Sequence, residues 1–208
     1  MTDKEALSAA LGDVRRAYRL LWSYQDRLFD IVGAIAGEFE SLKFYIWHPN
    51  SAARIDGGTD PRTRSAWFAF PMMNVSYLYR SGDDPNQAKA GDWLLDIRVV
   101  SDSGFDDVSH SPYDADPDDF AGIEATVSRI DLNIYLFTGE FKGNLLRDVW
   151  NRLEWPEPNG EVSEPSTHPV RTIGASFDIA DLGDKDAVAI ATRAFKASAV
   201  SALGVALA

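Results

Sequence analysis

The sequence lacks cysteine, and it lacks any long apolar run. Without cysteine among 208 residues, disulfides, thiolate metal sites and cysteine nucleophiles are all excluded. No stretch approaches the roughly 18 consecutive apolar residues that a membrane span requires. The first five residues also lack the basic segment and apolar run of a signal peptide. We therefore expect a soluble, cytoplasmic protein with no membrane partner.

Basic residues are also scarce. There are 20 of them against 32 acidic residues, which gives a formal net charge of −12. Such a surface repels phosphate backbones at long range, so no nucleic-acid partner is expected. The 45% hydrophobic content is enough for a packed core, and 208 residues fit one large domain. We interpret most of the acidic excess as a contribution to solubility.

The first 39 residues carry one long helical pattern. Its stripe, which follows a 3.5-residue period, consists of Leu7, Leu11, Val14, Tyr18, Leu21, Leu28, Val32, Ile35 and Phe39, with Gln25 as the polar exception. This period predicts a helix from Asp3 to Phe39, capped by Thr2 or Asp3. At about 1.5 Å per residue it would be about 55 Å long, more than one compact domain needs.

That excess length leaves two interpretations open. Gly33 or Gly37 breaks the helix, which would then be an ordinary core element, or part of the helix packs on another chain. Under the second interpretation the interface consists of Leu7, Leu11, Val14, Tyr18, Leu21 and Trp22.

Beyond residue 40 the apolar period changes to two. Strands are predicted at residues 42–47, 67–79, 93–100, 129–136 and 172–179, and Pro71 forces a break or bulge in the second of them. Apolar and polar residues alternate in most of these strands, as in an antiparallel sheet with one face on the core and one in water. The wet face would carry a cross-strand polar network of Asp96, Arg98, Arg129, Asp131 and Asn133.

Two more helical patterns complete the order. Residues 144–155 predict a short helix, and residues 185–203 an alanine-rich helix capped by Asp184 or Asp181. We predict a single α+β domain over residues 1–208: a long helix (1–39), antiparallel strands (42–138), a short helix (144–155), and a strand with a C-terminal helix (170–207). The long N-terminal helix and the C-terminal helix pack on one face of a sheet of about five strands.

One tripeptide suggests catalysis. Glu140-Phe141-Lys142 resembles the E-x-K element of metal-dependent nucleases, in which a second carboxylate completes a Mg²⁺ site. Asp96 and Asp131 are the available partners. Asp131 lies nine residues before Glu140, however, so in an unbroken strand the two side chains point to opposite faces. The alternative interpretation is an ordinary turn after a strand.

Two loops carry charge clusters. Asp114, Asp116 and Asp118 resemble the start of a calcium loop, but the sixth and twelfth positions, Asp119 and Ala125, should be glycine and glutamate. Only weak metal binding would remain there. In the loop of residues 48–65, Arg54, Arg62 and Arg64 offer a small-anion site without any phosphate-binding glycine motif.

Three hypotheses follow. The first is a non-catalytic protein-binding or self-assembly module that uses the long helix, with a protein partner or a second copy of the chain. The second is a Mg²⁺-dependent phosphodiesterase that uses Glu140 and Lys142 with Asp96 or Asp131. The third is an anion sensor built on the loop of residues 48–65. A cofactor, Mg²⁺, is expected only under the second hypothesis.

Overall fold

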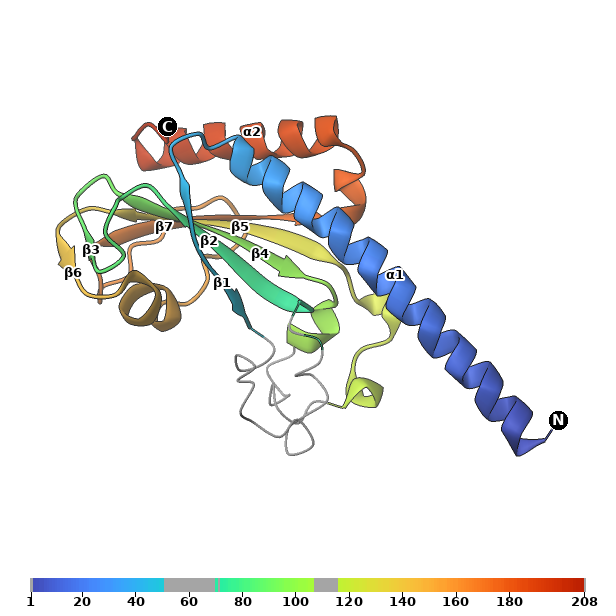
Figure 1. The fold of residues 1–208 in the computed structure, drawn as a ribbon. Coiled ribbons are helices and arrows are strands. Elements are labelled where there is room, and N and C mark those ends of the chain that lie inside the picture. Colours follow the sequence, from blue (N-terminus) through green and yellow to red (C-terminus); the bar gives the residue numbers. More distant parts are fainter. Residues whose placement is uncertain (1, 51–69, 71, 107–115, 208) are drawn as a thin grey trace.

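A computed structural model describes residues 2–50, 70, 72–106 and 116–207 (Figure 1). Helix α1 (Asp3–Gly37) is continuous, so Gly33 does not break it and Gly37 is its last residue. Thr2 and Glu5 form a capping box: Thr2 Oγ1 accepts from the Glu5 N–H (3.4 Å), and the Thr2 N–H donates to Glu5 Oε2 (2.8 Å). Two orphan backbone donors are thereby satisfied, which fixes the start of the helix.

The main sheet has five antiparallel strands. These are β1 (Lys43–Pro49), β2 (Asn74–Arg80), β4 (Trp93–Val100), β5 (Arg129–Phe137) and β7 (Val170–Asp178), in the order β1-β2-β4-β5-β7. The predicted α+β class is confirmed. The predicted strand at 67–79 starts only at Asn74, and residues 67–69 and 71 lie outside the described residues. Sequence reasoning missed a second, two-stranded sheet, β3 (Gln87–Ala88) with β6 (Phe141–Lys142), whose strands are too short to show a period.

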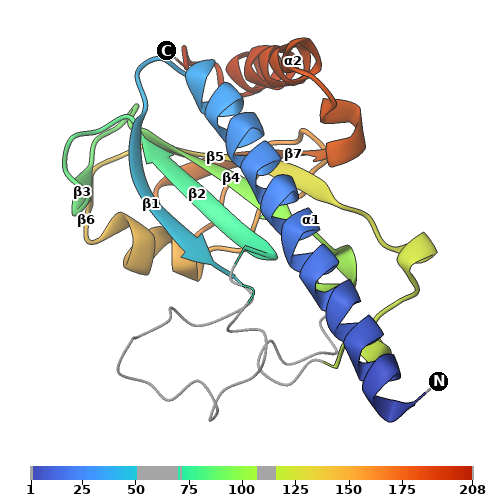
Figure 2. The same ribbon diagram turned by 45° about the vertical axis from the view of Figure 1, so that its right-hand side comes forward.

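Helix α2 (Lys185–Leu203) lies beside α1 on the same face of the sheet (Figures 1 and 2). Asp184 caps it by accepting from the Ala187 N–H at 2.9 Å. Glu38 forms a bidentate ion pair with Arg193, at 2.8 and 2.9 Å, that joins the two helices. Both helices bury their apolar stripes against alternate residues of the strands, which forms the larger core.

The opposite face of the sheet is also covered, so the prediction of a wet face is wrong. Every residue of β4 is buried, and so is every residue of β5 after Arg129. The cover begins with a single π-helical turn, η6 (Leu145–Val149), and a 3₁₀ turn, η7 (Trp150–Arg152), in place of the regular helix predicted at 144–155. Leu145, Val149 and Trp150 pack on Leu94 and Tyr135 in a second, smaller core.

Short 3₁₀ turns make up the remaining regular structure. They are η3 (Ser103–Asp106), η4 (Pro117–Asp119), η5 (Ile123–Ala125) and η8 (Ile179–Leu182). Among the described residues, none of the helices combines the length and the apolar character that a membrane crossing requires.

Candidate functional site

The first half of α1 projects beyond the sheet (Figure 1). We call residues 3–22 the overhang. The fully buried residues of α1 are Leu28, Ile31, Val32 and Ile35, all in its second half. The stripe residues of the overhang, by contrast, are 37–64% exposed, and Trp22 beside them is 69% exposed. The stripe is therefore one continuous pattern, of which one half lies on the sheet and the other half is uncovered.

This exposed stripe consists of the interface residues predicted from the sequence. They are Leu7, Leu11, Val14, Tyr18, Leu21 and Trp22. A scattered exposed leucine needs no explanation, but a contiguous exposed apolar stripe rimmed by charge is uncommon on the surface of a monomer. The charges on the overhang are four basic and three acidic residues, a net charge of +1 in a chain of −12. The overhang is thus slightly basic, in contrast to the chain as a whole.

The second feature is a buried polar network on the opposite face of the sheet. Its members are Asn74, Ser76, Asp96, Arg98, Asp106, Arg129, Asp131, Asn133 and Ser176. Asp106 bridges two guanidiniums, accepting from Arg98 Nη2 at 2.7 Å and from Arg129 Nη2 at 2.6 Å. Asp131 accepts from Arg129 Nε at 3.1 Å and lies 3.6 Å from Arg98 Nη1.

Asp96 lies at the centre of this face and is fully buried. Oδ2 accepts from the Trp150 indole N–H at 2.9 Å and from Asn133 Nδ2 at 3.5 Å. Oδ1 receives no hydrogen bond of normal geometry among the described residues. Burial raises the pKa of the Asp96 carboxyl to about 6, while Trp150, Ser76 and Arg98 act in the opposite direction. Asp96 is therefore a fully buried carboxyl group whose ionised form is destabilised by burial.

A long loop closes over the network. We call residues 153–167 the strap. The Arg98 guanidinium stacks on the Trp155 ring, with Arg98 Cζ 3.8 Å from the centroid of the ring. Further along, the Gly160 N–H donates to the Gly174 carbonyl (3.0 Å), and Ser163 and Thr172 exchange two backbone hydrogen bonds. The strap thus shields the ion pairs from water and pairs with the outer edge of β7.

Gly174 permits this close approach. A Cβ at this position would lie 2.9 Å from Asn133 Oδ1 and 3.0 Å from the Pro156 carbonyl oxygen. We expect Gly174→Ala to lower the free energy of unfolding by about 1–3 kcal/mol, because the backbone of the strap must move. The matched control is Gly33→Ala, since a Cβ there meets nothing within 4 Å and a helical alanine stabilises by about 0.5–1 kcal/mol. Urea denaturation of both variants measures the difference, and equal midpoints would contradict the expectation.

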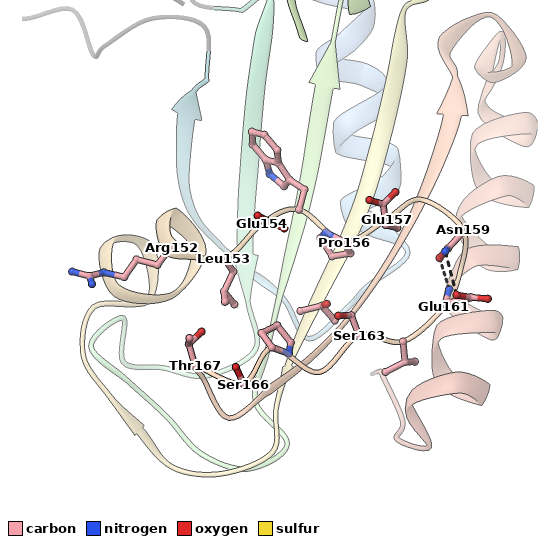
Figure 3. A pocket seen from close by; sticks show the side chains of 14 residues that line it. Arg152, Leu153, Glu154, Pro156, Glu157, Asn159, Glu161, Ser163, Ser166 and Thr167 are labelled. Carbon is pink, nitrogen blue, oxygen red and sulfur yellow. Dashed lines mark hydrogen bonds between the residues drawn. The ribbon is translucent and has the colours of Figure 1, made fainter. Parts of the chain in front are cut away.

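Figure 3 shows the hollow that the strap encloses, of about 740 Å³. Its lining residues come from residues 152–167 and from Thr172, and they include three glutamates and one arginine. A smaller hollow of about 220 Å³ lies against Arg98, Arg129, Asp131 and Asn133. Both arginines of this smaller hollow are already paired with carboxylates, so it offers no uncompensated cation to a small anion.

The residues of the nuclease hypothesis do not converge. Asp131 is the third residue of β5, whereas Glu140 and Lys142 lie beyond the other end of that strand and are exposed. Nine residues of strand span about 30 Å, too far for one Mg²⁺. Asp96 lies on β4, opposite Asn133. Over the described part of the chain, no group of three or more acidic or histidine side chains is placed to hold a metal ion.

Most residues of the anion-site and calcium-loop hypotheses lie outside the described residues. These are Arg54, Arg62, Arg64 and Asp114. Asp116 and Asp118 are described and exposed, and Asp116 Oδ1 accepts the Asp118 N–H at 3.0 Å as an ordinary turn cap.

Sequence reasoning found most of the network but missed its coverings. Asp96, Arg98, Arg129, Asp131 and Asn133 were all predicted to face one side. It missed Asp106, which follows no period, and it placed Trp150 and Trp155 in a regular helix over 144–155 without assigning them to the network. The available signal was the two tryptophans, which are more apolar than a surface in water needs unless they cover something.

Comparisons with known proteins agree along most of the chain. The sequence model of the PM0109 family matches residues 4–204. The uncharacterized protein PM0109 of Pasteurella multocida (strain Pm70) is 26% identical over 194 residues, which cover 88% of each chain. No solved structure matches. The network and all of the overhang after its first residue lie within the matched range.

Proposed function

The chain belongs to the PM0109 family, and we propose that it is a non-catalytic self-assembly module whose long N-terminal helix binds a second copy of the chain. The observation that carries the proposal is the uncovered half of the α1 stripe. Leu11 and Val14, at its centre, are 49% and 48% exposed, although the same stripe is fully buried two turns past Trp22. Burying such a stripe in water is favourable by about 25 cal/mol per Å².

The capping box supports the same function. A helix without tertiary contacts is marginal in water, and 20 residues of overhang gain stability mainly by packing. The start of the overhang is nevertheless fixed by the reciprocal Thr2 and Glu5 hydrogen bonds. A well-capped helix with a heptad stripe is pre-organised for pairing, which lowers the entropic cost of association.

The buried polar network does not favour catalysis. Its guanidiniums and carboxylates are paired with one another beneath the strap. The residues of the nuclease hypothesis do not converge: Asp96 lies on β4 and Asp131 near the start of β5, while Glu140 and Lys142 lie beyond the end of β5. We propose that the network holds the strap on the sheet and so makes the body rigid enough to support a projecting helix.

The test is the mass in solution, by light scattering, of the intact chain and of Leu11→Asp/Val14→Asp. We expect a mass of twice 22.9 kDa for the intact chain and of one chain for the variant. Two unpaired carboxylates in each copy of the interface should weaken the dimer at least about 100-fold. Because neither residue belongs to the core, the thermal transition of the body should persist.

The matched control is Ala9→Asp/Ser23→Asp, which adds the same charges to exposed positions away from the stripe. This variant should stay dimeric. A monomeric intact chain at all accessible concentrations would refute the proposal, and so would equal effects of the two double variants.

A further inference from the structure

The face of the sheet that bears the helices is covered only in part. Phe44 and Trp47 on β1 are 54% and 42% exposed. They pair in register with Tyr79 and Tyr77, which belong to the core under the helices, so all four side chains point to that face. A strip of aromatic surface on β1 and β2 therefore lies next to α1 without a helix of the described residues above it (Figure 2).

One flank of α1 turns toward this strip. Arg27 Nη2 donates to the Leu182 carbonyl at 2.9 Å, which turns its flank of α1 toward η8 and α2. Phe29 is two residues on, about 200° around the helix, and so lies on the flank that faces β1. Phe29 is 49% exposed, and Trp22, seven residues earlier, continues the same flank. The flank of the helix and the strip are thus two adjoining exposed apolar surfaces. We call them together the groove, with the flank of α1 as its wall and the strip as its floor.

The overhang has the length of this groove. Residues 3–22 span about 30 Å, and residues 23–39, which cross the sheet, span about 26 Å. We propose that each overhang lies in the groove of a second copy, antiparallel to the α1 of that copy, around a two-fold axis near Trp22. This inference rests on the proposed self-assembly and adds its geometry. The uncovered stripe of each overhang then faces the aromatic strip of the partner's sheet.

The charges along the two helices are complementary. With the axis near Trp22, Gly12 comes level with the partner's Gly33 along the helix axes, and Arg19 comes level with the partner's Asp26. Residues 23–40 carry four acidic residues and one basic residue, so a net charge of −3 faces the +1 of the overhang.

The surface available is large enough for a stable dimer. Five aromatic residues in each copy would enter the contact: Tyr18, Trp22, Phe29, Phe44 and Trp47, all 42–69% exposed. At roughly 100 Å² for each, these ten side chains alone bury on the order of 1,000 Å². Stable interfaces bury roughly 1,200–2,000 Å² in total. The aliphatic residues of the overhang supply the remainder.

Because the chain has no cysteine, crosslinking tests this geometry without background. In Gly12→Cys/Gly33→Cys the two thiols of one chain are about 31 Å apart along α1. They can therefore pair only between copies. We expect mild oxidation to convert most of this variant to a covalent dimer, while the single variants Gly12→Cys and Gly33→Cys stay uncrosslinked. A Cβ meets nothing closer than 3.9 Å at either position, so both variants should fold.

The outcomes separate the geometry from the proposed function. A dimer that crosslinks through Gly12→Cys alone would mean that the overhangs pair with each other, which overturns the groove but not self-assembly. A dimer in which no variant crosslinks also overturns the groove. A monomeric intact chain overturns both.

A second variant tests the floor of the groove. Phe44→Asp/Trp47→Asp should raise the dissociation constant of the dimer at least about 10-fold while the body stays folded, because both side chains lie outside the core. The control is Ile190→Asp on α2, at a position that is 69% exposed and far from the groove. Unchanged dissociation of the Phe44→Asp/Trp47→Asp variant would place the partner helix elsewhere.

Discussion

Arg98→Ala should lower the free energy of unfolding by about 3–5 kcal/mol, the range observed when one partner of a buried ion pair is removed. The Arg98 guanidinium donates to Asn74 and Asp106, faces Asp131 and stacks under Trp155. Without it, the carboxylates of Asp106 and Asp131 share Arg129 alone, in a site that is largely buried. For a chain of this size the melting temperature should fall by roughly 10 °C.

Thermal unfolding followed by circular dichroism checks this prediction, with Arg147→Ala as the control. Arg147 also holds an ion pair, with Asp148 at 2.8 Å, but its side chain is mostly exposed. Exposed pairs contribute little, because water solvates both charges equally well when they are apart. If both substitutions lowered the melting temperature equally, the network would not hold the strap on the sheet as we propose.

Asp96→Asn should stabilise the protein at pH 8 by up to about 3 kcal/mol. Burial raises the pKa of Asp96 from 3.8 to about 6, and each pKa unit corresponds to about 1.4 kcal/mol. The folded state therefore holds its proton more tightly than the unfolded chain does. The contribution of this acid is fully favourable below pH 4 and is lost as pH rises through 6. The uncharged amide avoids that loss, so its advantage should shrink as pH falls from 8 to 4.

Urea denaturation at several pH values measures this difference, with Asp148→Asn as a control of opposite sign. The Arg147 guanidinium, together with the Asn144 N–H, lowers the pKa of Asp148 to about 2. Its contribution is thus present above pH 4 and lost as pH falls toward 2, so Asp148→Asn should destabilise at neutral pH. If the free energy of unfolding of Asp96→Asn and of the unmodified chain depended on pH in the same way, burial would not destabilise the ionised form of Asp96.

The long helix and the strands could be predicted because their side chains repeat. The 3.5-residue stripe predicted α1 to within two residues of its end, and alternation in 93–100 and 129–136 predicted β4 and β5. The same alternation misled us about the second face. Asp96, Arg98, Asp131 and Asn133 are the residues that a wet face would carry, because polar groups that satisfy one another inside a protein look the same in sequence as polar groups in water.

The strap and the groove lie beyond the reach of local patterns. Trp155 meets Arg98 across 57 positions, and Gly174 is required only because the strap passes 3.0 Å from its Cβ position. The exposed state of Phe44 and Trp47 follows from where α1 and α2 end across the sheet. No periodic pattern in the sequence indicates how much of the sheet the two helices cover.

The order of the sheet has a consequence for how the chain folds. The strands of the main sheet follow one another in space in the same order as in the sequence, β1-β2-β4-β5-β7. The sheet can therefore grow from one edge as the polypeptide is synthesised. Helix α2 joins α1 only at the last step, when Arg193 reaches Glu38 across 155 positions. A chain that stops after β7 would lack Val188, Phe195, Ala199 and Leu203, with which α2 covers part of the larger core. We therefore expect the final thirty residues to make folding cooperative.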